Sequence, residues 1–248
     1  MNKTSWGKVA NWYDNFIEKT EDSYQKQLIL PNLLRLLELK RGEVVLDLAC
    51  GQGFFANEFA KAGTKVIGVD VASELINIAK QSKLGEYYVA SADNISFLKD
   101  GSIDKAVIIL SLQNIQNVSD TIKESARVLK PKGKIYIVLN HPAFRIPKRS
   151  SWGWDDAGKT QYRRLDAYLS ESKEAIQMHP GENPKLKTVS LHRPLQFYFK
   201  MLSKNGLFVS RLEEWNSNKV SEPGPKKEAE DKARKEFPLF LFLEAVKQ

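Results

Sequence analysis

The stretch Val44-Val45-Leu46-Asp47-Leu48-Ala49-Cys50-Gly51-Gln52-Gly53 decides the fold of this chain. Its β-branched and aliphatic residues predict a buried parallel strand, and its glycines allow a tight turn and the close approach of a ligand. The next residues, 54–61, predict a helix. A strand, a glycine-rich turn and a helix in this order predict an open α/β sheet, with a ligand at the carboxyl end of the strand.

Two carboxylates at strand ends indicate which ligand binds there. A second predicted strand, residues 65–69, ends at Asp70, and an acidic side chain at that point can accept hydrogen bonds from both hydroxyls of a ribose. Asp47 would repel the pyrophosphate of a dinucleotide and attract a sulfonium and an ammonium group. The charges therefore favour S-adenosylmethionine over NAD, although residues 51–56 also fit the dinucleotide pattern GxGxxG/A. A glycine turn without a ligand is the remaining alternative. We expect no metal cofactor.

Five segments in order resemble a class I S-adenosylmethionine-dependent methyltransferase of the small-molecule, ubiquinone-biosynthesis-like group (methyltransferase type 11). The segments are DLACGQG at 47–53, VIGVD at 66–70, SADN at 91–94, SLQN at 111–114 and RVLKPKGKIYIV at 127–138. The resemblance covers residues 44–139. It implies an α/β fold with a Rossmann-like, mostly parallel sheet of seven strands in the order 3-2-1-4-5-7-6, strand 7 antiparallel, with helices on both faces. It also implies methyl transfer to a small molecule and release of S-adenosylhomocysteine.

One position departs from the family pattern. The usual turn before the fifth strand reads LKPGG, and this chain has Lys132 in place of the first glycine. A type I turn led by Pro131 accepts a lysine there, because that turn needs no residue with positive φ. We therefore expect a type I turn.

The strand ends and the resemblance together give a set of cofactor-binding residues. Asp70 is expected to bind the ribose and Val71 to pack on the adenine. The resemblance assigns Asp93 to the adenine amino group, with capping of its own turn as the alternative. Tyr13 resembles the family's N-terminal lid residue, with a core aromatic as the alternative. The expected cofactor-binding residues are Tyr13, Asp47, Ala49, Gly51, Gly53, Asp70, Val71, Ala92, Asp93, Asn94, Ser111 and Gln113.

Candidate catalytic and substrate-binding residues follow the fourth and fifth strands. Methyl transfer needs alignment and exclusion of water, and it needs a base only when the acceptor must lose a proton. His141 and His192 are the candidate bases, and a structural histidine is the alternative for each. Arg145 would bind an acidic acceptor unless it lies on a solvated loop or in a positive patch for nucleic acid. Two tryptophans would form a wall for an aromatic acceptor unless they pack the insertion. The expected substrate-binding residues are Asn114, Arg145, Trp152 and Trp154.

The composition sets bounds on the class of protein. The chain has 248 residues, of which 42% are hydrophobic, and it contains no apolar run long enough to span a membrane. Its first residues do not resemble a signal peptide, and its single cysteine, Cys50, fits a reducing cytoplasm. The net charge of +8 is spread along the chain, so nucleic acid is not the expected partner. We expect a cytoplasmic monomer or homodimer; an RNA methyltransferase and a catalytically inactive cofactor-binding protein are the alternatives.

The order of predicted elements gives the organisation of the chain. Alternating strands and helices between residues 44 and 139 predict a parallel sheet. Strands at 175–178 and 188–192 predict one hairpin in the segment that follows. The expected parts of the single domain, 1–248, are an N-terminal helical lid at 1–40, a cofactor-binding core at 41–139, an inserted hairpin over the substrate site at 140–193 and the completion of the sheet at 194–248.

Overall fold

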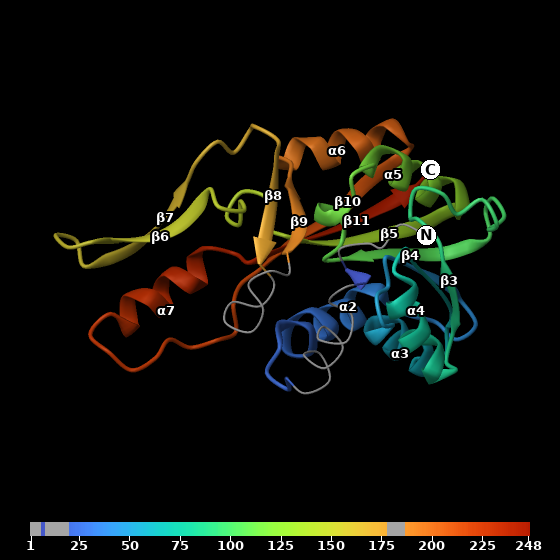
Figure 1. Ribbon diagram of the computed structural model, residues 1–248, viewed down its shortest axis with the longest axis horizontal. Helices are drawn as coiled ribbons and strands as arrows, with labels where there is room; N and C mark the ends of the chain where they lie inside the picture. Colours follow the sequence, from blue (N-terminus) through green and yellow to red (C-terminus); the bar gives the residue numbers. More distant parts are fainter. Residues whose placement is uncertain (1–5, 8–19, 178–186) are drawn as a thin grey trace.

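The computed structural model describes residues 6–7, 20–177 and 187–248. Within these residues the largest sheet has seven strands in the order β10-β11-β5-β4-β1-β2-β3 (Figure 1). Strands β1 to β5 run parallel, and β11 runs antiparallel to both β5 and β10. This confirms the expected order, in which the last strand of the sequence lies beside the fifth. The strands are β1 (Val44–Leu48), β2 (Lys65–Asp70), β3 (Glu86–Val89), β4 (Ile103–Ile109), β5 (Leu129–Asn140), β10 (Leu207–Trp215) and β11 (Phe240–Lys247).

Helices cover both faces of the sheet (Figure 1). Helices α2, α3 and α4 lie on one face, and α5 and α6 lie on the other. The helices are α2 (Leu30–Leu37), α3 (Phe54–Lys61), α4 (Ser73–Ala79), α5 (Val118–Val128), α6 (Leu195–Lys204) and α7 (Lys227–Glu236). Shorter turns of helix are η2 (Gln25–Ile29), η3 (Lys80–Ser82) and η4 (Leu112–Asn114). None of the helices in the described part of the chain is long and apolar enough to cross a lipid bilayer.

Helix α5 shows why the sequence forms these layers. Its buried residues include Thr121, Ile122, Ser125 and Ala126, and spacings of three and four residues place them on the side that faces the sheet. The two buried hydroxyls donate hydrogen bonds within the helix, Thr121 Oγ1 to the carbonyl of Asn117 at 2.9 Å and Ser125 Oγ to the carbonyl of Thr121 at 2.7 Å. The helix therefore buries polar residues without leaving their hydroxyls unpaired.

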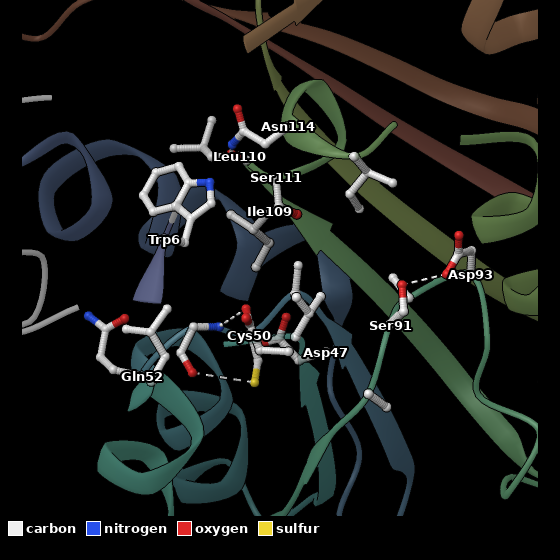
Figure 2. A pocket seen from close by; sticks show the side chains of 18 of the residues that line it. Trp6, Asp47, Cys50, Gln52, Ser91, Asp93, Ile109, Leu110, Ser111 and Asn114 are labelled. Carbon is white, nitrogen blue, oxygen red and sulfur yellow. Dashed lines mark hydrogen bonds between the residues drawn. The ribbon is translucent and has the colours of Figure 1, made fainter. Parts of the chain in front are cut away.

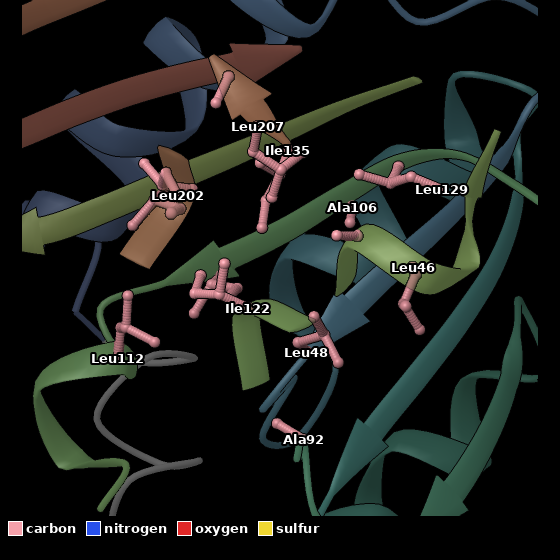
Figure 3. Close-up of a cluster of buried hydrophobic side chains, with 14 of the residues drawn as sticks. Leu46, Leu48, Ala92, Ala106, Leu112, Ile122, Leu129, Ile135, Leu202 and Leu207 are labelled. Atoms are coloured by element: carbon pink, nitrogen blue, oxygen red, sulfur yellow. The ribbon is translucent and has the colours of Figure 1, made fainter. Parts of the chain in front are cut away.

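Aliphatic side chains fill the layer between the sheet and the helices α5 and α6 (Figure 3). Leu46, Ala106 and Ile135 come from three neighbouring strands, and they meet Ile122 and Leu202 from the two helices. Burying one large aliphatic side chain contributes about 1.5–3 kcal/mol, so this layer fixes the strands firmly. The carboxyl ends of those strands are consequently held in place relative to one another.

The segment between β5 and α6 holds two hairpins, where the sequence predicted one. Strands β8 (Ser172–Gln177) and β9 (Lys187–His192) form the expected antiparallel pair. Strands β6 (Ser150–Asp155) and β7 (Thr160–Leu165) form a second pair, which projects from the body of the molecule and packs against α7 (Figure 1). The prediction of a single hairpin is therefore wrong. The turn that was missed lies at residues 156–159, where the carboxylate of Asp155 accepts hydrogen bonds from the amides of Ala157 and Gly158.

The turn before the body of β5 differs from the expected type. Lys132 has a φ of +63°, in the left-handed region where glycine is usual. A type I turn has negative φ at both central residues, so that expectation is wrong. This turn therefore holds a lysine in a backbone conformation that favours glycine.

Candidate functional site

The turn after β1 folds through three residues in the left-handed region. Ala49 has a φ of +58°, Gly51 of +58° and Gly53 of +85°. The Cys50 amide donates to the carbonyl of Val69 at 3.0 Å, which ties the turn to the end of β2. Two of these three positions are glycines, where positive φ carries no steric cost. Gly53 is the N-cap residue of α3, so the glycines turn the chain directly from β1 into the helix.

A cavity of about 380 Å³ opens beside this turn, at the carboxyl ends of β1, β2 and β4. Many of the predicted cofactor residues line it, together with the predicted substrate residue Asn114. The predicted residues in the lining are Asp47, Ala49, Gly51, Asp70, Val71, Ala92, Asp93, Ser111 and Asn114. Gly53, Asn94 and Gln113 are not in the lining, and Tyr13 lies outside the described residues.

Asp70 spans the turn with both of its carboxylate oxygens. Its Oδ2 accepts a hydrogen bond from the amide of Gly51 at 3.0 Å, and its Oδ1 accepts one from the amide of Ala72 at 2.8 Å. Burial raises the pKa of Asp70, and these backbone hydrogen bonds oppose the rise. Each oxygen keeps a second lone pair, so the carboxylate can also accept from a ligand.

Asp47 lies one strand away in a different environment. Its side chain is 2% exposed, and within the described residues its Oδ2 has no hydrogen-bond partner. Burial and the nearby charge of Asp70 raise the pKa of Asp47 well above its ordinary value. A buried carboxyl oxygen without a partner is costly, so this atom marks a place where a ligand group is expected.

Two further polar atoms in the cavity wall lack partners. Ser111 Oγ and Gln52 Nε2 are buried, and no described residue hydrogen-bonds to them. Figure 2 shows Trp6 near the segment that carries Ser111, on the opposite side of the opening from Asp93. The apolar part of the wall was not predicted. It includes Trp6, Phe54, Phe55, Leu75, Ile109 and Ile115.

Asp93 and its neighbours form the far end of the cavity. Ser91 Oγ donates a hydrogen bond to Asp93 Oδ1 (Figure 2). The Asn94 amide donates to the carbonyl of Ser91 at 2.9 Å. Asp93 therefore makes a side-chain contact with Ser91, and it also lines the cavity. Asn94 contributes only to the turn.

The segment after β4 presents its amides in two different ways. Gln113 is buried, and its Nε2 donates to the carbonyl of Leu110 at 2.7 Å. Asn114 lines the cavity, although its Nδ2 also reaches the carbonyl of Leu110 at 3.4 Å. Gln113 thus stabilises the turn through a hydrogen bond to its backbone, while Asn114 lies in the cavity wall, where it can contact a ligand.

His141 follows β5, but both of its ring nitrogens are engaged within the protein. Its Nε2 hydrogen-bonds Glu214 Oε1 at 2.8 Å, and its Nδ1 accepts from the amides of Ala143 and Phe144 at 3.2 and 3.4 Å. Since Nδ1 accepts, Nε2 carries the proton. Burial lowers the pKa of His141 against the opposing effect of Glu214. The ring is absent from the cavity lining, and its contacts are those of a structural histidine.

His192 is held through one of its ring nitrogens. Its Nε2 lies 2.7 Å from the carbonyl oxygen of Tyr168, and a carbonyl only accepts, so Nε2 carries the proton. No described residue is seen to hydrogen-bond Nδ1, but the residue is buried and is absent from the cavity lining. His192 ends β9, which packs against η4 beside the cavity.

Three predicted substrate residues lie on the insertion or its approach, outside the cavity lining. The guanidinium of Arg145 lies 5.7 Å from the ring of Phe240. Trp152 packs edge to face on Phe237 at 5.5 Å. Lys226 lies 4.5 Å from the ring of Trp154. Both tryptophans therefore join the β6–β7 hairpin to the segment around α7, which is the packing alternative.

The chemistry of the described lining residues is acidic and apolar. Asp47, Asp70 and Asp93 are in the lining, and no lysine, arginine or histidine is. Such a site suits a ligand with positive charge and an aromatic ring, and its described lining offers no basic side chain to a pyrophosphate. S-adenosylmethionine fits because it carries a sulfonium, an ammonium and an adenosine. No group of three or more side chains suited to a metal ion occurs among the described residues.

Comparisons with known proteins agree with this geometry. Residues 46–137 match the family model described as a methyltransferase domain. A ubiquinone biosynthesis O-methyltransferase of Xanthomonas euvesicatoria pv. vesicatoria is 29% identical over 157 residues, which are 55% of this chain and 65% of that protein. A demethylmenaquinone methyltransferase of Paenarthrobacter aurescens is 32% identical over 108 residues, 43% of this chain and 42% of that protein. Both matches span less than two thirds of the relative.

A solved structure extends the similarity to most of the chain. The S-adenosylmethionine-dependent methyltransferase of Mesorhizobium loti superposes with a TM-score of 0.69 and 24% sequence identity. The superposition covers 88% of this chain and 96% of that one. At this identity the likeness concerns the fold alone.

Proposed function

We propose that this chain, which belongs by its fold and by the domain at residues 46–137 to the class I S-adenosylmethionine-dependent methyltransferases, transfers a methyl group to a small-molecule acceptor. The observation that carries the proposal is the charge of the cavity. Three carboxylates and no basic side chain occur among its described lining residues. That arrangement favours a cationic donor over a dinucleotide.

The donor's parts are assigned to the residues that suit them. Asp70 would accept hydrogen bonds from the ribose hydroxyls, and Val71, which is 46% exposed beside it, would pack on the adenine. Asp93 would accept from the adenine amino group. Asp47 and Ser111, two lining residues that each have a buried oxygen without a partner among the described residues, would bind the charged end.

When bound, S-adenosylmethionine supplies an electrophilic methyl group and a neutral leaving sulfur. The protein's contribution is to hold donor and acceptor in line and to exclude water, and such positioning is worth about 7–11 kcal/mol of the barrier in favourable cases. The apolar wall of Phe54, Phe55 and Ile109 provides a dry surface for this. Neither candidate base, His141 or His192, is in the described cavity lining, so we assign no proton acceptor to either of them.

The acceptor is proposed to be a largely apolar ring with a hydroxyl or a nucleophilic carbon. The wall next to Asn114 adds Ile115, Gln116 and Asn117, which offer amide groups on an otherwise apolar surface. No basic side chain in the described lining would recognise an acidic group. The relatives named for ubiquinone and menaquinone biosynthesis support an acceptor of this kind.

Calorimetry followed by an acceptor screen tests the proposal. S-adenosylmethionine and S-adenosylhomocysteine should both give saturable heats, and NADH should give none. The protein should then transfer radiolabel from methyl-labelled donor to phenols or quinols of the tested set, and salt-dependent labelling of RNA should not occur. Binding of NADH without binding of either sulfur compound would refute the assignment.

A further inference from the structure

Asp47 combines three features that its neighbour Asp70 does not share. The residue is almost fully buried, its side chain makes no hydrogen bond to the described residues, and its Oδ2 lacks a partner although the residue lines the donor cavity. Asp70 instead accepts two backbone hydrogen bonds at 2.8 and 3.0 Å, which stabilise its ionised form. Of the two carboxyls, Asp70 is therefore built to hold the negative charge and Asp47 is not.

No cation among the described residues compensates Asp47. The titratable groups that interact with it are Asp70 from β2, Cys50 from the turn and Tyr87 from β3. An ionised neighbour at Asp70 opposes a second negative charge, and neither the thiol of Cys50 nor the hydroxyl of Tyr87 supplies a positive one. The pKa of Asp47 is raised accordingly by burial and by Asp70.

We propose that Asp47 is protonated in the ligand-free site at neutral pH and releases its proton to solvent when the positively charged donor enters the cavity. The inference rests on the proposed function, because it needs S-adenosylmethionine as the ligand. Binding then exchanges one positive charge for another: a proton leaves the Asp47 carboxyl, and the donor's sulfonium or ammonium takes its place. No bond of the donor is broken in this step.

The exchange makes donor affinity depend on pH. Below the ligand-free pKa of Asp47, a proton must leave for each donor bound, so the dissociation constant should fall by up to tenfold for each unit of pH increase. Above that pKa the affinity should become constant. In Asp47→Asn the residue cannot ionise, so affinity should be weaker and should not change with pH through this group.

Titration calorimetry measures the released proton directly. The wild-type protein is titrated with S-adenosylmethionine at pH 7 in phosphate, HEPES and Tris, whose ionisation enthalpies differ. The observed heat should vary linearly with the buffer's ionisation enthalpy, and the slope should approach one proton released per donor. The slope should be close to zero in Asp47→Asn.

Infrared difference spectroscopy identifies the group that loses the proton. The carbonyl stretch of a protonated carboxylic acid should disappear when the donor binds to the wild-type protein. This loss of the carbonyl band on binding should also be seen in Asp70→Asn, and it should not be seen in Asp47→Asn. If donor binding removed the carbonyl band in Asp47→Asn but not in Asp70→Asn, the proposal would be overturned, since the proton would then belong to Asp70.

The product separates the two positive groups of the donor. S-adenosylhomocysteine keeps the ammonium but has a neutral sulfur. Equal proton release by donor and product supports the proposal with the ammonium as the partner of Asp47, and smaller release by the product supports it with the sulfonium. Donor binding with a heat independent of the buffer would overturn this inference and leave the proposed function standing. No heat with either ligand would overturn both.

Discussion

At the scale of single residues, the site depends on how two aspartates at adjacent strand ends are surrounded. Asp70 accepts backbone amides on both oxygens, and Asp47 accepts none from the described residues. Identical side chains on two neighbouring strands can thus serve different purposes, one to bind neutral hydroxyls and the other to bind a positively charged group. Sequence position alone gives both as acidic residues at strand ends, and it does not distinguish them.

Replacing Asp70 by asparagine tests the ribose assignment. The variant keeps an oxygen for one backbone amide but loses the charge-assisted hydrogen bonds to the ribose, so the dissociation constant for S-adenosylmethionine should rise 10- to 100-fold, about 1.4–2.8 kcal/mol. Equilibrium binding by calorimetry measures this. Asp166→Asn, an exposed acid paired with Arg164 outside the cavity lining, is the matched control and should bind as the wild type does. Unchanged affinity in Asp70→Asn would remove Asp70 from the site.

Lys132 offers a second prediction at this scale. Its φ of +63° costs a non-glycine residue about 1–2 kcal/mol. Glycine would remove this strain, but its greater freedom in the unfolded chain would offset part of the gain in stability. Lys132→Gly should therefore stabilise the protein by roughly 0.5–1 kcal/mol. Urea denaturation at constant m-value measures the change. Lys132→Ala removes the same charge but keeps the strained backbone, so a gain of equal size in that control would contradict the explanation.

At the scale of elements, the insertion is joined to the cavity by a buried arginine. Arg193 follows β9, and its Nη2 donates to the carbonyls of Ile115 and Gln116 at 3.1 and 2.9 Å. Both of those residues line the cavity. The guanidinium also lies 5.2 Å from the ring centre of Phe197 in α6. One side chain thus holds the acceptor wall, the hairpin and a helix together.

Arg193→Met should separate these elements. Methionine fills a similar apolar volume but leaves the two carbonyls without their donor, so the free energy of unfolding should fall by about 2–4 kcal/mol. Arg164→Met is the control, because that arginine is 68% exposed and pairs only with Asp166 among the ion pairs of the described residues; it should change stability by less than about 0.5 kcal/mol. Equal losses in the two variants would show that Arg193 does not have the role described.

The elements differ in how well the sequence predicts them. The βα units from β1 to α5 follow from local patterns, since each strand is a short apolar run and each helix has one apolar side. The β6–β7 hairpin was missed because its strands pack mainly on α7, more than sixty residues later, and expose much of their other side. Its alternating Ser151-Trp152-Gly153-Trp154 pattern is the signal that was available.

Site residues divide along the same line. The positions of Asp47, Asp70 and Ser111 beside the cavity were predictable, because the topology of a parallel sheet brings strand ends together. The contacts of His141 were not predictable from the sequence, because its Nε2 hydrogen-bonds Glu214, which comes from a strand distant in the sequence. Trp6 likewise reaches the cavity through tertiary packing against Ala72 and Leu75.

At the scale of the whole molecule, the buried carboxyl of Asp47 links stability to pH. The native state keeps a proton on Asp47 that the unfolded chain gives up above its ordinary pKa of 3.8, so the unfolded state binds fewer protons in that window. Stability of the ligand-free protein from this group therefore falls as pH rises from about 4 towards the native pKa, by about 1.4 kcal/mol per pH unit. The contribution of His141 to stability changes with pH in the opposite direction. Its pKa is lowered in the native state, so the unfolded chain binds more protons below about pH 6.5 and stability from this group rises with pH there.

Comparing Asp47→Asn with the wild type isolates the first of these effects. Asparagine resembles the protonated carboxyl and does not titrate, so the variant should gain stability relative to the wild type as pH increases from 5 to 7. The gain should approach about 1.4 kcal/mol per unit while the native carboxyl remains protonated. Urea denaturation of both proteins at several pH values, without ligand, gives the difference. A difference that does not vary with pH would show that Asp47 is already ionised in the folded protein.

The place of β11 in the sheet has a consequence for how the molecule is made. This strand, residues 240–247, lies between β5 and β10 and is hydrogen-bonded to both. While a ribosome is still producing the chain, β5 keeps one side open until residue 247 has cleared the exit tunnel. Nascent chains halted before that point should remain sensitive to protease along β5, and they should attract chaperones that hold exposed strand edges.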